Sequence, residues 1–222
     1  EKLLAKLERG EVPAETEYLP TRFQVDGSLG SEEWTDFQLD GYGTWLWGLA
    51  QFCRNSRHPL WQEARPAVEM VVRYLAALWQ SPNYDCWEEH RDKIHTATLA
   101  ALYGGLNAVH AVDPALVASD LPISIREFVL KHCVSADGHF MKFIGNDAVD
   151  ASLLWTSIPY GLVDVDDSRF KATLTKIEHD LHYPGGGVYR FRADTYFGGG
   201  EWLLLAAWLG WVYVQLGRMD EA

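Results

Sequence analysis

The chain has 222 residues, 48% of them apolar, and this length allows one substantial hydrophobic core without requiring a second domain. A formal net charge of -12 without a basic stripe excludes an ordinary nucleic-acid-binding surface, and no apolar run is long enough to cross a bilayer. No basic-then-apolar leader is visible at the start, so we expect a cytoplasmic protein.

Cysteine and tryptophan are the informative residue types. The 3 cysteines form an odd, widely spaced set that fits neither a disulfide framework nor a zinc site, and it is typical of buried side chains in a reducing compartment. The 10 tryptophans are many for this length. Tryptophan has a flat apolar face and one N–H group, which suits sugar rings, although a large helical core also accounts for such a count.

Helical periodicity dominates the first half of the chain. In chain order it predicts a charged helix over 1–10, an irregular segment over 11–39, and three helices: one over 40–54, one from the early sixties to about 80, and one over 95–112. Pro66 is expected in the first turn of the second of these helices, where a missing N–H costs little. Small residues recur in the 95–112 helix, including Ala101 and Gly105, and they permit close approach by a neighbouring helix or a ligand.

The second half alternates between helices and short β-hairpins. The pattern predicts helices over 123–133, 150–158, 164–181 and 202–216, and hairpins around 136–143 and 185–191. Each hairpin precedes an apolar helix, which gives a weak internal repeat of roughly 50 residues. Because helices that are apolar all round alternate with one-sided helices, we predict an all-α toroid with inner and outer helices. We expect residues 1–222 to form one such domain.

Two adjacent carboxylates, Glu88 and Glu89, follow Trp87 in the loop before the 95–112 helix. Cys86 and Trp87 are expected to lower the polarity around Glu88 and so keep its carboxyl protonated near neutral pH. Cleavage of a glycosidic bond requires such an acid. On these residues alone, the alternative remains that both glutamates simply favour the start of the following helix through its dipole.

Four segments together resemble glycoside hydrolase family 15, the glucoamylase family. In chain order they read EEWTDFQLDGYGTWLWGL, YDCWEEHRDKIHTATLAALYGGL, DASLLW and GGGVYRFRADTYFGGGEWLLLAAWL. Their order is that of the family, and the similarity runs from about residue 20 to the C-terminus. The resemblance implies an (α/α)6 toroid that removes glucose from the non-reducing ends of α-glucosides with inversion, and it implies no metal cofactor.

The resemblance also implies roles for individual residues. Glu88 corresponds to the general acid, Asp85 to a support of its loop, and Gln38 and Asp40 to residues that steady this loop or cap the next helix. The residues expected to bind substrate or shape its subsites are Trp34, Gln38, Asp40, Asp85, Trp87, Glu89, Asp150 and Trp202. The implied partner is a small α-gluco-oligosaccharide rather than a nucleic acid or a membrane, and the oligomeric state stays open.

The chain departs from the family pattern at several points. Asn146 stands where a substrate-binding arginine is often found, and GGGEW replaces the usual Asn-Pro-Trp, which leaves Glu201 unassigned. An inverting enzyme also needs a second carboxylate, about 6.5–9.5 Å from the acid, to activate water. In the family this general base lies beyond the helix that corresponds to the last helix predicted here, 202–216, so we expect it beyond residue 222. We therefore expect a fragment of a longer enzyme, incomplete at both ends, and the alternative is a degenerate relative of the family.

Other functions remain as alternatives. Phosphorylase kinase regulatory subunits carry a similar domain with a Gln-Leu-Asp segment like residues 38–40, which points to a non-catalytic carbohydrate-binding toroid. The string DVDD at 164–167 matches the acid motif of class II terpene cyclases, but its place before an amphipathic helix predicts a helix cap. For an enzyme, α-1,4, α-1,6 and trehalose linkages all stay open, and the segment at 86–106 looks closest to compact bacterial members, some of which prefer α-1,6 glucosides.

Overall fold

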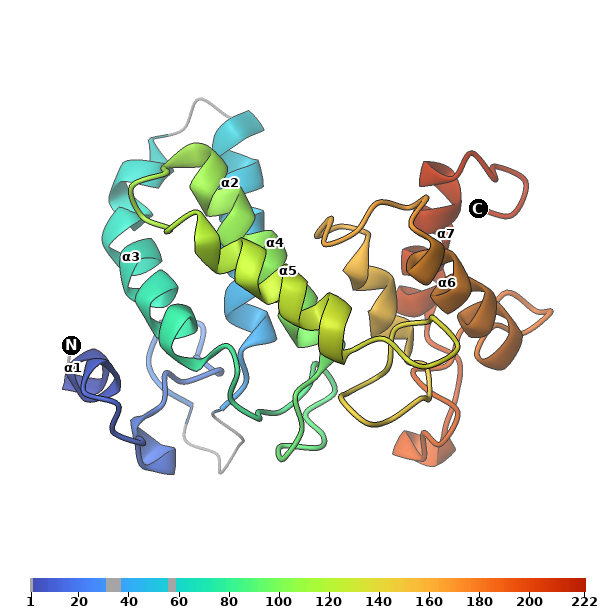
Figure 1. Cartoon of the computed structure of the whole chain (residues 1–222), viewed down its shortest axis with the longest axis horizontal. Helices are drawn as coiled ribbons and strands as arrows, with labels where there is room; N and C mark the ends of the chain where they lie inside the picture. The colour runs from blue at the N-terminus through green and yellow to red at the C-terminus, as the bar shows by residue number, and fades with distance from the viewer. Residues whose placement is uncertain (1, 31–36, 56–58) are drawn as a thin grey trace. The chain divides into compact units, whose positions relative to one another are not determined.

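The computed structural model describes residues 2–30, 37–55 and 59–222, and this part of the chain is mainly helical (Figure 1). Its α-helices are α1 (Lys2–Glu8), α2 (Asp40–Asn55), α3 (Leu60–Leu78), α4 (Thr96–Val112), α5 (Asp120–His132), α6 (Ser168–Asp180) and α7 (Leu203–Gln215). Short 3-10 helices are η1 (Glu15–Glu17), η2 (Ala151–Thr156) and η3 (Tyr196–Gly198). Within the described ranges, β-structure is limited to isolated bridges, so the predicted all-α class is confirmed.

Three elements differ from the predicted ones. Helix α3 begins at Leu60, so Pro66 lies inside the helix and not in its first turn. Helix α5 begins at Asp120, and Pro122 falls in the first turn, where it costs no backbone hydrogen bond. The helix predicted over 150–158 is the short 3-10 helix η2, which ends at Thr156. Pro159 limits its length, because the residue before a proline disfavours the α conformation.

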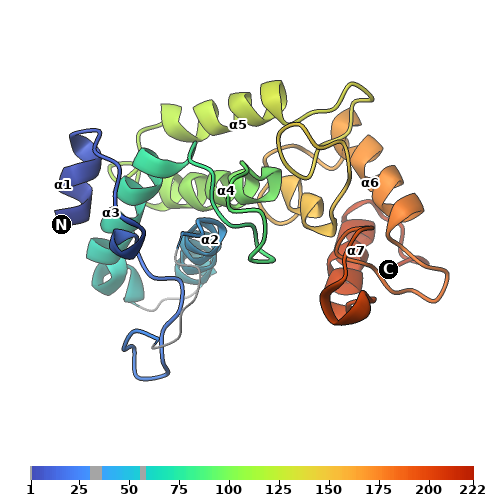
Figure 2. The ribbon, with the colours of Figure 1, turned by 90° about the horizontal axis from the view of Figure 1, so that it is seen from below.

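The chain divides into two compact units, one with residues 1–94 and 101–125 and the other with 95–100 and 126–222. In the first unit, α3 packs against both α1 and α2 (Figure 2). In the second unit, η2 packs against α6 and α7. Each unit buries large apolar side chains of its own, so each has a hydrophobic core. None of the described helices combines the length and the hydropathy that a bilayer span requires.

Glycines allow α2 and α4 to touch through their backbones. A Cβ atom placed on Gly43 would lie 2.6 Å from the carbonyl oxygen of Ala101, and one on Gly105 would lie 2.3 Å from the carbonyl oxygen of Gly43. No side chain fits such gaps, because real Cβ contacts are longer. The close approach expected from the small residues of α4 is therefore present. It fixes the first turn of α2 directly against α4.

The second unit contains the internal repeat. Val134 pairs with Phe140, and His182 pairs with Val188, in antiparallel bridges across two tight turns. Gly138 in the first turn and Gly186 in the second have φ values of +85° and +93°, in the left-handed region that favours glycine. Equivalent pairs therefore recur roughly 50 residues apart, as the sequence repeat predicts.

The DVDD string caps a helix. The carboxylate of Asp167 accepts a hydrogen bond of 2.9 Å from the N–H of Arg169, in the first turn of α6. Asp164 accepts a similar bond of 2.9 Å from the N–H of Asp166. These bonds confirm the helix-cap interpretation of the string.

Replacing Gly43 by alanine is expected to lower the free energy of unfolding by about 1–3 kcal/mol, because the new methyl group must push α4 away from α2. Gly48→Ala on the same helix is the matched control, since a Cβ there meets nothing within 4 Å. That control should gain about 0.5–1 kcal/mol from its higher helix propensity. Urea unfolding followed by tryptophan fluorescence distinguishes the two, and equal midpoints for both variants would contradict the packing.

Candidate active site

The loop over residues 85–90 is folded around the side chain of Asp85. Its Oδ1 accepts hydrogen bonds from the N–H groups of Trp87, at 3.0 Å, and Glu89, at 2.9 Å. The N–H of Glu88 donates to the carbonyl of Asp85 at 2.9 Å. Asp85 is only 4% exposed, so water does not compete for these bonds. Asp85 thus stabilises the loop that carries Glu88, the supporting role that the family resemblance implies for it.

The same loop holds two residues in the left-handed region. Glu88 has a φ of +64° and His90 a φ of +51°, values that side chains with a Cβ disfavour. The bonds to Asp85 on either side of Glu88 hold the turn in this conformation. Its side chain is exposed in the described structure, so the prediction that Cys86 and Trp87 enclose Glu88 in apolar surroundings is wrong. A turn this tight directs the side chain outward, away from its sequence neighbours.

The segment that leads into α2 is attached to this loop. The N–H of Tyr84 donates to the carbonyl of Phe37 at 3.0 Å, and the N–H of Leu39 donates to the side chain of Asn83 at 3.3 Å. Gln38 and Tyr84 form a parallel β-bridge. These contacts join two segments that are separated in the sequence by α2 and α3. They agree with the expectation that residues 38–40 steady the loop of the proposed acid.

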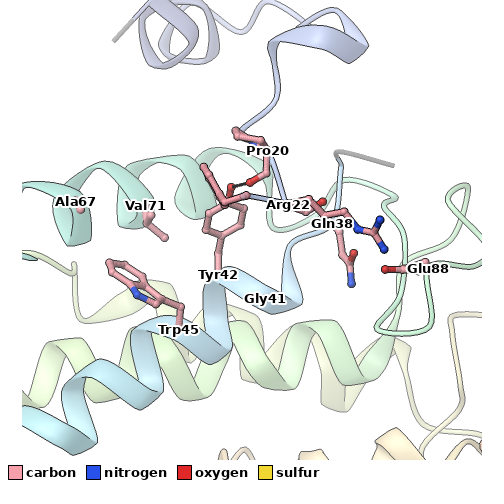
Figure 3. A pocket seen from close by; sticks show the side chains of 11 residues that line it. Pro20, Arg22, Gln38, Gly41, Tyr42, Trp45, Ala67, Val71 and Glu88 are labelled. Atoms are coloured by element: carbon pink, nitrogen blue, oxygen red, sulfur yellow. Dashed lines mark hydrogen bonds between the residues drawn. The ribbon is translucent and has the colours of Figure 1, made fainter. Parts of the chain in front are cut away.

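A pocket of about 630 Å³ opens beside the loop. It is lined by Pro20, Thr21, Arg22, Phe23, Gln38, Gly41, Tyr42, Trp45, Ala67, Val71 and Glu88. At one end, the side chains of Arg22, Gln38 and Glu88 point toward one another, and at the other end lie the rings of Tyr42 and Trp45 (Figure 3). Polar groups at one end and aromatic rings at the other suit a ligand with hydroxyl edges and flat C–H faces.

Of the lining residues, only Gln38 and Glu88 were predicted as site residues, and the others include Arg22, Tyr42 and Trp45. Tyr42 and Trp45 lie on α2 three positions apart, so helical spacing alone places them on one face. Arg22 comes from the irregular segment before α2, where no periodicity shows which way a side chain points. The hydroxyl of Tyr42 donates a hydrogen bond of 2.5 Å to the carbonyl of Pro20, which fixes this segment over the pocket. A local sequence signal therefore existed for the two aromatic residues but not for Arg22.

Asp40 begins α2 and is 6% exposed. Burial raises the pKa of its carboxyl to about 6, and the negative charge of Asp85 acts in the same direction. A hydrogen bond from the side chain of Gln38 opposes this rise. Asp40 and Asp85 are thus two buried carboxyl groups on segments that the bridge between Gln38 and Tyr84 holds side by side.

The structure brings together most of the predicted site residues. The first unit contains Gln38, Asp40, Asp85, Trp87, Glu88 and Glu89. Of these, Gln38 and Glu88 line the pocket, whereas Trp87, expected to form its wall, is not among the lining residues. Trp34 lies outside the described residues.

Asp150 and Trp202 belong to the second unit. Asp150 is 1% exposed; it accepts hydrogen bonds of 2.8 Å from the N–H and 2.6 Å from the hydroxyl of Ser152, and its carboxylate lies 3.0 Å from the Nζ of Lys142. It therefore caps η2 and forms a buried ion pair. Trp202 is half-buried, and its ring lies 5.5 Å from the guanidinium carbon of Arg190.

Comparisons with known proteins agree on one family. Residues 20–221 match the model of "Glycosyl hydrolases family 15". Isomaltose glucohydrolase from Kribbella flavida is 44% identical over 224 residues, which cover 97% of this chain and 57% of that enzyme. The chain therefore spans little more than half the length of this relative.

Solved structures of glycosidases superpose on this chain over nearly its whole length. A wild-type glycosidase superposes with a TM-score of 0.91 at 41% identity, over 99% of this chain and 60% of that chain, and a variant of it was solved in complex with glucose. A bacterial glucoamylase complexed with acarbose superposes with a TM-score of 0.72 at 16% identity, over 97% of this chain and 37% of that chain. The chain thus has the α/α-toroid fold of glucoamylases over the part that it covers.

Asp85→Ala is expected to loosen the loop, because the N–H groups of Trp87 and Glu89 lose their buried acceptor. The free energy of unfolding should fall by about 1–3 kcal/mol. Backbone amide exchange over 86–90, followed by mass spectrometry, should become faster. Asp92→Ala is the control, since Asp92 is an exposed aspartate just after this loop. In this control, amide exchange over 86–90 should equal that of the wild type. Equal exchange over 86–90 in both variants would contradict the role of Asp85.

Proposed function

The chain belongs to glycosyl hydrolase family 15, and on that premise we propose that the whole protein is an exo-acting, inverting α-glucosidase with Glu88 as its general acid. It releases glucose from the non-reducing ends of short α-glucosides. The position of Glu88 carries the proposal, since a loop fixed by Asp85 presents this carboxyl to a pocket that also contains Arg22 and Gln38. No single feature of the sequence distinguishes such an acid from an exposed glutamate, but this placement favours it.

The proposed reaction requires two carboxyl groups. Glu88 gives its proton to the glycosidic oxygen as the bond from this oxygen to the anomeric carbon breaks. A second carboxylate, about 6.5–9.5 Å away, takes a proton from water, which attacks from the opposite face and inverts the anomeric carbon. We place this general base beyond residue 222, in the additional length that the relatives have. A sugar in the pocket displaces water from Glu88, and less polar surroundings favour the neutral acid.

The pocket supports a small substrate. Tyr42 and Trp45 provide surfaces for the C–H faces of a sugar ring, while Arg22 and Gln38 offer hydrogen-bond donors to its hydroxyl groups. From the family resemblance, Trp34, Trp87, Glu89 and Trp202 are proposed as further residues that bind sugar or shape its subsites. Asp40, Asp85 and Asp150 are buried, so in the proposal they support their neighbours and do not touch the sugar. The similarity to an isomaltose glucohydrolase favours the α-1,6 disaccharide isomaltose as the first substrate to assay.

Replacing Glu88 by glutamine in the whole protein is expected to lower kcat by roughly 10²–10⁴-fold, because the amide keeps the shape of the side chain but cannot supply the proton. Binding of glucose, measured by calorimetry, should be nearly unchanged. Glu69→Gln, an exposed position on α3, is the control and should keep wild-type turnover. An unchanged kcat in Glu88→Gln would exclude Glu88 as the acid.

Glucose release from isomaltose, maltose and trehalose, with NMR detection of the first anomer formed, tests the reaction itself. Inversion predicts an initial excess of β-glucose from isomaltose and maltose, and one β- and one α-glucose from trehalose, because the leaving glucose of trehalose keeps its α configuration. An initial excess of α-glucose from isomaltose or maltose, or α-glucose alone from trehalose, would exclude the inverting mechanism. Sugar binding without turnover of any substrate would instead support the non-catalytic, carbohydrate-binding alternative.

A further inference from the structure

Two buried carboxyl groups, that of Asp85 within the loop of Glu88 and that of Asp40 at the start of α2, have different roles. Asp85 accepts two backbone N–H bonds through one oxygen, a role for which the ionised carboxylate is the stronger acceptor. Asp40 is just as buried, at 6% exposed against 4% for Asp85. The bridge between Gln38 and Tyr84 places the segments of the two carboxyl groups side by side. Two ionised carboxylates in such a buried site repel each other and lose their hydration. The pair is therefore most stable with one proton.

The surroundings of Asp40 show which group takes the proton. Among the described residues, the groups that act on its carboxyl include the side chain of Gln38, the N–H groups of Asp40 and Gly41, and the charge of Asp85. From α4, the atoms closest to a Cβ placed on Gly43 are backbone atoms of Ala101 and Leu102, which carry no charge. From α3, the ring of Tyr74 packs edge-on against the ring of Tyr42, with 5.7 Å between their centroids.

We propose that Asp40 and Asp85 hold one proton between them, on Asp40, and that neutral Asp40 is a positioning residue for the loop of the general acid. As long as Asp40 is neutral, Asp85 keeps its charge and both of its bonds to the loop. When Asp40 also ionises, its repulsion acts on the same carboxylate that holds Trp87 and Glu89. The effect on catalysis rests on the function proposed for Glu88, but the shared proton and its effect on the loop do not.

The direction of the pKa shift agrees with this assignment. The pKa of Asp40 is raised to about 6 from the ordinary value of 3.8. A group with a raised pKa in the folded state contributes its full stability below the unfolded value and loses it as pH rises through the folded value. Neutral Asp40 therefore contributes its full stability below about pH 4, and this contribution disappears between about pH 4 and 6.

Asp40→Asn isolates the effect, because asparagine has the shape of a protonated aspartate and cannot ionise. Between pH 4 and pH 7, the folded-to-unfolded ratio of the wild type should fall on the order of 100-fold more than that of Asp40→Asn. Urea unfolding at each pH measures both ratios, and Asp92→Asn, at an exposed site, is the control that should follow the wild type. Parallel pH curves for Asp40→Asn and the wild type would overturn the shared proton.

The loop gives a second measurement that does not depend on activity. In the wild type, amide exchange over 86–90, corrected for its intrinsic pH dependence, should become faster from pH 5 to pH 7, and in Asp40→Asn it should not. A ¹³C NMR titration of the wild-type aspartate carboxyl groups should show one that titrates near pH 6. Loop exchange in the wild type that does not depend on pH, or the absence of a carboxyl that titrates near pH 6, would overturn the proposal even if Asp40→Asn does not fold.

Activity then tests the link to catalysis. If the loop measurements behave as expected and Glu88→Gln is inactive, the kcat of the wild type should fall more steeply above pH 6 than that of Asp40→Asn. A wild-type and an Asp40→Asn profile with the same shape would show that Asp40 does not position the acid. Full activity of Glu88→Gln would instead overturn the proposed function and leave the shared proton intact.

Discussion

The carboxylate of Asp85 is the interaction on which the candidate site depends. Its two hydrogen bonds to the loop hold Glu88 in a backbone conformation that a residue with a Cβ disfavours. A buried acceptor is effective here because no water replaces the bonds when they break. Without them, nothing in the sequence of the loop itself favours the turn that presents Glu88 to the pocket.

The loop is also positioned from below, by the contact between α2 and α4. Gly43 allows the first turn of α2 to lie directly against α4. This turn starts with Asp40, and it directly follows the segment in which Gln38 pairs with Tyr84. Helix packing and the site are therefore linked through a few residues at one helix end. This explains why small side chains in α4 and a buried carboxyl in α2 occur together.

Periodicity and capping were sufficient to predict most of the helices, because both depend on residues that are close in the sequence. The cap of α6 by Asp167 is one example. The loop of Glu88 was predicted from its family pattern, and its support by Asp85 follows from that pattern. The exposure of Glu88 and the absence of Trp87 from the pocket lining could not be predicted, since they depend on a left-handed backbone conformation. Arg22 reaches the pocket through tertiary contacts of an irregular segment, for which no local rule exists.

The positive φ of Glu88 also limits which replacements are informative at this position. Valine, isoleucine and threonine are the least compatible with the left-handed region, because their branched Cβ collides with the backbone there. A defect in such a protein would combine the missing carboxyl with a rebuilt turn. Glycine has the opposite effect, since it relaxes the backbone while it removes the acid. Only unbranched polar side chains of similar length separate the chemistry of this residue from its geometry.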